Sequence, residues 1–144
     1  MLKIVLDTNI FISALLGKES GYSRKIIEKI LDGTVTPLMG EALFNEYLDV
    51  MRRNEIIDKC LLNEQERFEF LTAFMNCCQW SKIYFSWRPN LRDEGDNHVI
   101  ELAIAGGAKY IITNNIKDLK SGELFFVGLE IVTPDYFMKE VVWE

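Results

Sequence analysis

The chain contains little histidine, cysteine or proline, and it has no long apolar run. Its 144 residues include one histidine, three cysteines and three prolines. Cys60, Cys77 and Cys78 are odd in number and lack C-x-x-C spacing, so neither a disulfide framework nor a cysteine zinc site is indicated. Because there is no apolar stretch of roughly 18 residues and no secretory pattern at the start, we expect a cytoplasmic protein without a membrane span.

A surplus of basic residues is also absent, although it is the usual mark of a nucleic-acid-binding protein. The chain has 22 acidic and 16 basic residues, which gives a net charge of −6. One explanation is that some carboxylates cluster to hold divalent cations, which turn a repulsive pocket into one that attracts phosphate. The other explanation is an ordinary solvated acidic surface.

Apolar strands alternate with amphipathic helices along the whole chain. The length and the 49% of hydrophobic residues predict one domain, residues 1–144. Strands are predicted at Leu2–Leu6, around Val35, and at Lys82–Trp87, Tyr110–Thr113 and Glu130–Val132. Helices are predicted at Gly21–Leu31, Glu41–Arg53 and Asp96–Ala105. Two more are predicted to start at a capping box formed by Asn63 and Glu66, and at Pro134, which follows the capping residue Thr133. This alternation predicts a mainly parallel sheet covered on both sides by helices.

Asp7 comes directly after the apolar run Leu2–Leu6 and is followed by Thr8 and Asn9. Ligands of open α/β sheets bind just beyond the carboxyl ends of the strands, so Asp7 is a candidate site residue. The alternative is that Asp7 only caps the next helical turn. Thr113 ends a second apolar strand in the same way, and we expect Asp7 and Thr113 to face one pocket.

Two further carboxylates are expected to reach this place from helices. Glu46 falls on the border of the apolar stripe of its helix, where a carboxylate needs water, a partner or a metal. The alternative is a boundary residue near Arg53. Asp96 is in line with the apolar face of its helix, so its side chain is expected to point inward. Asp93 or Glu94 is expected instead to stabilise the start of this helix.

The single histidine, His98, is predicted to lie on the opposite face of its helix from Asp96, at the surface. This placement leaves no histidine for acid–base or zinc chemistry. Asn115 and Asp118 follow another strand and add oxygen donors, which hard cations such as Mg²⁺ or Mn²⁺ prefer. Such ions activate water for in-line phosphodiester cleavage, so no serine, cysteine or histidine nucleophile is required.

Motifs along nearly the whole chain resemble the PIN-domain family of metal-dependent ribonucleases. They are I-V-L-D-T-N-I-F-I-S-A-L-L at the start, N-E-Y-L-D-V-M in the middle, D-E-G-D-N-H-V-I-E-L-A-I-A-G-G-A-K-Y-I-I-T-N-N from Asp93, and V-T-P-D-Y-F-M at the close. Within the family the chain is most similar to small, stand-alone prokaryotic toxins of toxin–antitoxin pairs. The resemblance implies an α/β/α sandwich, Mg²⁺- or Mn²⁺-dependent cleavage of RNA, a possible antitoxin partner and frequent dimerisation.

Residue by residue, the resemblance matches Asp7, Glu46 and Asp96 to the first three acids of the family, as catalytic and metal-binding residues. Asn115 occupies the position where the family often has a fourth acid, and Asp118 can supply the charge instead. Because of this departure, a second interpretation stays open: a catalytically weak or inactive PIN-like module that binds RNA or protein. The residues expected to support the site are Thr8, Asn9, Asp93 and Thr113.

Two other α/β classes also begin with an apolar strand that ends in aspartate, and both fit less well. A haloacid-dehalogenase-type phosphatase has a second aspartate two residues after the first, where this chain has Asn9. A receiver domain has an acidic pair before its phosphoacceptor and a lysine on its last strand, and neither is recognisable here.

An apolar segment near the start of the chain allows two interpretations. Its residues either complete the core or remain exposed as an association surface for a second copy or an antitoxin helix. The residues of this segment are Ile10, Phe11, Ile12, Leu15 and Leu16.

Overall fold

The computed structural model describes residues 2–17, 21–82, 97–116 and 128–141, and a five-stranded parallel sheet lies at their centre. The strands are β1 (Leu2–Leu6), β2 (Val35–Met39), β3 (Gln79–Trp80), β4 (Tyr110–Ile112) and β5 (Glu130–Val132). Their order in the sheet is β3-β2-β1-β4-β5, and every neighbouring pair is parallel. The carboxyl ends of all five strands therefore meet at one edge of the sheet.

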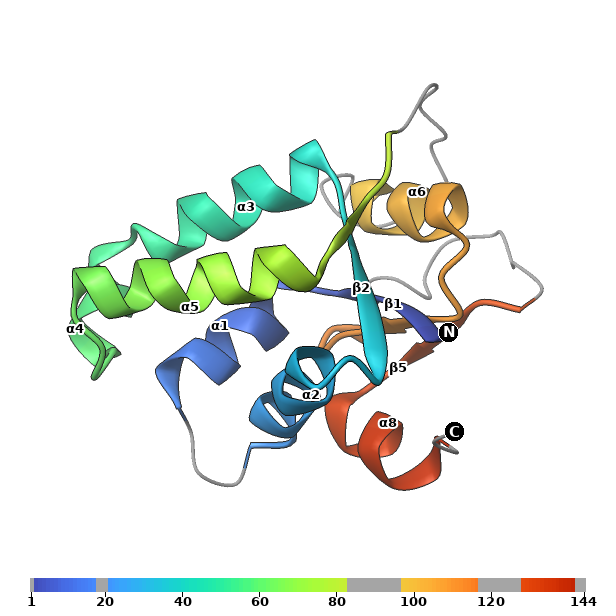
Figure 1. Cartoon of the computed structure of the whole chain (residues 1–144), viewed down its shortest axis with the longest axis horizontal. Helices are drawn as coiled ribbons and strands as arrows, with labels where there is room; N and C mark the ends of the chain where they lie inside the picture. The colour runs from blue at the N-terminus through green and yellow to red at the C-terminus, as the bar shows by residue number, and fades with distance from the viewer. Residues whose placement is uncertain (1, 18–20, 83–96, 117–127, 142–144) are drawn as a thin grey trace.

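Helices cover this sheet on both sides. The helices of the described ranges are α1 (Thr8–Leu16), α2 (Tyr22–Leu31), α3 (Glu41–Met51), α4 (Asn54–Lys59), α5 (Glu64–Cys77), α6 (Asn97–Gly106) and α8 (Pro134–Glu140). Figure 1 shows α1, α2, α3 and α5 gathered on one side of the strands and α6 on the other. The predicted α/β/α sandwich with a parallel sheet is confirmed.

Local sequence signals explain where several helices begin. The Asn63 side chain accepts a hydrogen bond from the Glu66 N–H at 2.8 Å, and the Glu66 side chain accepts one from the Asn63 N–H at 3.0 Å. This reciprocal pair satisfies backbone donors that a helix start leaves free, and it starts α5 as predicted. The Thr133 hydroxyl caps α8 by accepting from the Tyr136 N–H, with Pro134 in the first turn.

Two predicted elements differ from the structure. The helix expected over Glu41–Arg53 ends at Met51, and a separate helix, α4, follows it without having been predicted. Of the strand expected over Lys82–Trp87, only Lys82 is among the described residues, and it is not in a strand. The described edge strand is β3, which ends two residues earlier.

The apolar segment that begins at Ile10 belongs to the core, so its proposed role as an exposed association surface is wrong. Ile10 and Phe11 are fully buried, Ile12 and Leu15 are nearly so, and Leu16 is half-buried. The reason is that α1 packs against α2 and α3, which enclose its apolar face. No helix in the described parts of the chain is both long enough and apolar enough to cross a membrane.

Candidate functional site

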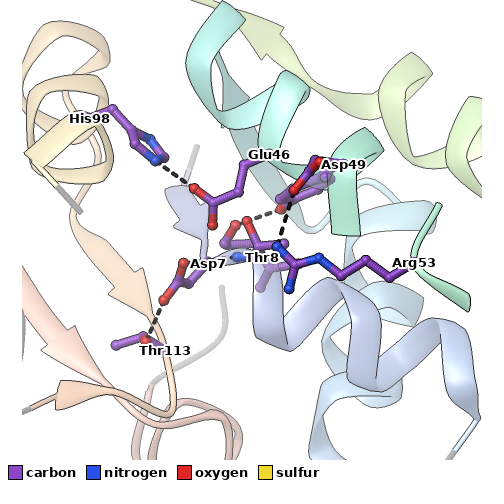
Figure 2. A network of polar contacts seen from close by, with 9 residues as sticks. Asp7, Thr8, Glu46, Asp49, Arg53, His98 and Thr113 are labelled. Carbon is purple, nitrogen blue, oxygen red and sulfur yellow. Dashed lines mark hydrogen bonds and ion pairs between the residues drawn. The ribbon is translucent and has the colours of Figure 1, made fainter. Parts of the chain in front are cut away.

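Asp7 and Thr113 lie side by side at the carboxyl ends of β1 and β4. The register pairs Leu6 with Ile112, so the next residue on each strand reaches the same edge. The Thr113 hydroxyl donates a hydrogen bond of 2.6 Å to Asp7 Oδ2, as Figure 2 shows, and both side chains are buried. The predicted juxtaposition of the two strand ends is confirmed. Strands β2 and β3 lie on one side of β1, and the later strands β4 and β5 lie on the other. The boundary between β1 and β4 is therefore the topological switch point, where open α/β sheets bind ligands.

Asp7 has a capping role as well as a place in the site. Its Oδ1 accepts a hydrogen bond of 2.9 Å from the Thr8 N–H, which caps α1. Burial raises the pKa of Asp7 above its ordinary value, the hydrogen bonds from Thr113 and Thr8 oppose this shift, and the nearby charge of Glu46 adds to it. The carboxyl group is therefore fixed in orientation and close enough to a second carboxylate to be repelled by it.

Glu46 reaches the site from α3 and contacts His98 on α6. Glu46 Oε2 lies 2.6 Å from His98 Nε2. Burial works against ionisation of Glu46, but the interactions with His98 and with the Thr8 hydroxyl outweigh it and lower the pKa of Glu46. Arg53 pairs with Asp49 instead, at 3.1 Å, so Glu46 is not simply a boundary residue held by that arginine.

The prediction that His98 is a surface residue is wrong. Its side chain is only 18% exposed and faces Glu46. The helical period placed His98 relative to Asp96 alone and took no account of α3, which packs against the first turn of α6. Figure 2 shows His98 approaching Glu46 from α6 while Thr113 approaches Asp7 from β4.

Several buried polar atoms around the two carboxylates make no hydrogen bond to the described residues. They are Thr8 Oγ1, Asn9 Oδ1 and His98 Nδ1, together with Glu101 Oε1 further along α6. Although the Thr8 hydroxyl is near enough to lower the pKa of Glu46, it is not in hydrogen-bond geometry with that carboxylate. Burying unpaired polar atoms is costly, and three of these four adjoin the Asp7–Glu46 pair, as expected of a ligand-binding site.

The structure describes some of the other predicted site residues and not others. Asp93, Asp96 and Asp118 lie outside the described residues. Asn115 is described and exposed, and its backbone N–H donates to the Thr113 hydroxyl at 2.9 Å. Within the described ranges no group of three or more histidine, cysteine, aspartate and glutamate residues forms a complete metal site.

The donors that are described nonetheless fit a hard divalent cation. Mg²⁺ sites commonly use one or two carboxylates, together with waters and substrate phosphate. Asp7 and Glu46 provide two carboxylates from separate elements, and the charge of Glu46 adds to the burial that raises the pKa of Asp7. A bound cation removes this repulsion. Asp7 and Glu46 are therefore the two described carboxylates whose positions suit a metal ligand.

Fold and site together define an α/β protein with paired carboxylates at the switch point of a parallel sheet. A family model described as "PIN domain" matches residues 3–117. The chain therefore belongs to the PIN-domain family. It is 30% identical over 151 aligned positions to the uncharacterized protein MJ1680 of Methanocaldococcus jannaschii, with 96% of this chain and 91% of that protein covered.

A solved structure supports the same fold. It is the crystal structure of VapBC2 from Rickettsia felis bound to a DNA fragment from their promoter. The matched chain superposes with a TM-score of 0.61 and 18% sequence identity, over 92% of this chain and 98% of that one. At this level of identity the similarity establishes the architecture alone.

Proposed function

We propose that this protein is a divalent-metal-dependent endoribonuclease that acts in the cytoplasm as the toxin of a toxin–antitoxin pair. The observation that carries the proposal is the pair of converging carboxylates, Asp7 and Glu46, at the switch point of the sheet. Membership of the PIN-domain family supports a hydrolase, because PIN domains are generally nucleases. The structural similarity to VapBC2 of Rickettsia felis, which was crystallised with a DNA fragment from their promoter, supports the antitoxin part of the proposal.

The residues of the site divide into metal holders and groups that orient them. Asp7 and Glu46 hold Mg²⁺ or Mn²⁺, and Asp96, with Asn115 or Asp118, completes the ligand set by family resemblance. When bound, the ion would supply activation of water and neutralisation of charge during phosphodiester cleavage. The Thr113 hydroxyl and the Thr8 N–H fix both oxygens of Asp7. The remaining supporting residues in this proposal are Asn9 and Asp93.

His98 has the corresponding orienting role for Glu46. Its contact at 2.6 Å holds Oε2 of the carboxylate. The other oxygen, Oε1, remains available for a cation, because an ionised carboxylate has several lone pairs to offer. Hydrogen bonds to metal-binding groups fix their orientation and tune their basicity, so His98 is expected to affect metal affinity without contacting the RNA.

A cognate antitoxin and a second copy of the chain are the protein partners in this proposal. The apolar face of α1 is buried within the chain, so it does not provide the association surface. Light scattering of the purified chain, alone and with the product of an adjacent antitoxin gene, measures both associations directly.

The second candidate function is a PIN-like module that binds RNA or protein without cutting. It is favoured by Asn115, an exposed amide where the family often has an acid. The two candidates differ in one measurable way, because both permit RNA binding and only the nuclease yields metal-dependent fragments.

The test is cleavage of a mixed single-stranded and structured RNA pool with Mn²⁺, Mg²⁺ or EDTA. We expect fragments with either metal and none with EDTA. Asp7→Asn is expected to lower cleavage by orders of magnitude, while its side chain can still cap α1. The matched control is Asp49→Asn, because Asp49 is exposed and pairs only with Arg53 among the described contacts.

The outcomes separate the candidate functions. An unmodified chain that binds RNA and metal but gives no fragments points to the non-cutting module. Cleavage by Asp7→Asn at the unmodified rate shows that the reaction occurs elsewhere on the chain.

A further inference from the structure

Tyr47 connects the two elements that carry the paired carboxylates. Its hydroxyl donates a hydrogen bond of 2.5 Å to the backbone carbonyl of Leu6. Tyr47 is the residue after Glu46 on α3, and Leu6 is the residue before Asp7 on β1. One hydrogen bond therefore joins the immediate chain neighbours of both carboxylates.

The Tyr47 ring is held by apolar packing in addition to this hydrogen bond. The ring is fully buried and stacks on Phe11, with centroids 4.6 Å apart and an angle of 19° between the planes. Phe74 packs on it as well, at 5.9 Å between centroids. Apolar packing of this kind holds an aromatic ring whether or not it carries a hydroxyl group. The hydroxyl therefore has a role that is separable from the packing of the ring.

The hydroxyl is a permanent donor in the physiological range. The ordinary pKa of a tyrosine hydroxyl is about 10, so the group stays protonated at neutral pH. The Leu6 carbonyl can only accept, so the polarity of this contact is fixed. The contact is also buried away from water. A hydrogen bond in such surroundings is stronger than one at the surface, and its loss costs more free energy.

We propose that Tyr47 is a positioning residue, which sets the separation of Glu46 and Asp7 so that both carboxylates reach the same divalent cation. This inference rests on the proposed metal site and adds a residue that contacts neither metal nor substrate. Apolar contacts are not directional, so on their own they define the position of α3 less sharply than a hydrogen bond does. The Tyr47–Leu6 hydrogen bond is directional and sits next to the two groups whose spacing matters. Metal sites tolerate only small errors in ligand distance, so a slight shift of α3 weakens binding.

The test compares the Mn²⁺ affinities of the unmodified chain and of Tyr47→Phe by titration calorimetry. Urea unfolding of both chains measures their stabilities. Groups behind metal ligands typically contribute 10- to 100-fold to affinity, and for this contact we expect Tyr47→Phe to bind Mn²⁺ about tenfold more weakly. The control is Tyr110→Phe, because Tyr110 is also buried and packs edge-on against Phe137, but it begins β4 at the end away from Thr113. This variant is expected to keep the original affinity.

A second variant separates the hydroxyl from ring packing. Phe11→Leu loosens the stack on Tyr47 and leaves the hydroxyl in place, so we expect it to lose stability and keep most of its Mn²⁺ affinity. Unchanged affinity in Tyr47→Phe overturns the inference, as does an equal loss in Phe11→Leu. A Tyr47→Phe chain that fails to fold also overturns it, because the hydroxyl would then serve overall stability. If the unmodified chain itself binds no Mn²⁺, the proposed metal site fails, and this inference fails with it.

Discussion

Glu46 and His98 are 52 positions apart in the sequence, and their contact of 2.6 Å joins α3 to α6 across the carboxyl edge of the sheet. The contact lies directly above the pair formed by Asp7 and Thr113 in Figure 2. The two carboxylates of the site are therefore each held by a polar group from a different element. Four separate segments must pack correctly before this geometry exists.

Removing the His98 side chain is expected to destabilise the chain modestly. In His98→Ala, Glu46 keeps its partial burial and loses its partner, which costs about 1 kcal/mol once partial exposure is allowed for. The loss is expected to be much smaller in a Glu46→Ala background, where the hydrogen-bond partner is already absent, and urea unfolding of all four chains in a double-mutant cycle measures the coupling. Arg53→Ala is the control, because Arg53 and its partner Asp49 are 53% and 72% exposed and should contribute little. Equal costs for His98→Ala and Arg53→Ala would contradict a buried role for the histidine.

Asp7→Asn is expected to stabilise the metal-free chain at neutral pH. The pKa of Asp7 is raised in the folded state, so its ionised form opposes folding at pH above the folded-state pKa. This penalty shrinks as the pH falls through that pKa, and it vanishes below the unfolded value. Thermal unfolding in EDTA should therefore show a higher Tm for the variant at pH 7, by about 4 °C for each 1 kcal/mol gained, and a smaller difference at pH 4. A difference that grows on acidification would reverse the sign and refute the argument.

Thr113→Val replaces the hydroxyl with a methyl group of similar volume at a fully buried position. The variant leaves one Asp7 oxygen and the Asn115 N–H without their partner, which should cost about 1–3 kcal/mol. We also expect weaker Mn²⁺ binding, because the orientation of Asp7 is no longer fixed. Thr72→Val on the exposed side of α5 provides the control and should be nearly neutral. Full Mn²⁺ affinity in Thr113→Val would show that the hydrogen bond to Asp7 is dispensable for the site.

The sequence predicts β1, β2, β4 and β5 but not the exposed edge strand β3, because buried parallel strands have a simple signature. Ile4–Leu6 and Tyr110–Ile112 are continuous apolar runs followed by polar residues, and this pattern also predicts that Asp7 and Thr113 meet. His98 and Tyr47 were missed for a different reason. Their roles depend on how α3 packs against α6 and β1, and helical periodicity describes one helix at a time. Tyr47 in particular looks like any other member of the apolar stripe of α3.

Asp96 is the strongest untested member of the proposed site. It matches the third acid of the PIN-domain family and lies outside the described residues. Asp96→Asn is expected to lower RNA cleavage by orders of magnitude, with little change in the cooperativity of unfolding. Cleavage at the unmodified rate would remove Asp96 from the site and leave Asp7, Glu46 and Asp118 as the acids proposed to hold the metal.

Asn115→Asp restores the acid that the family often has at this position. Asn115 is exposed and its backbone is already fixed by the Thr113 hydroxyl, so the added charge meets no packing obstacle. A third negative group near Asp7 and Glu46 strengthens attraction for a divalent cation and increases repulsion when none is bound. We therefore expect tighter Mn²⁺ binding and a lower Tm in EDTA, with faster RNA cleavage if metal affinity limits the reaction. Asp118→Asn in the same background measures whether that residue had been supplying the charge. An Asn115→Asp chain with unchanged Mn²⁺ affinity and unchanged Tm would show that position 115 lies too far from the carboxylate pair to be a ligand.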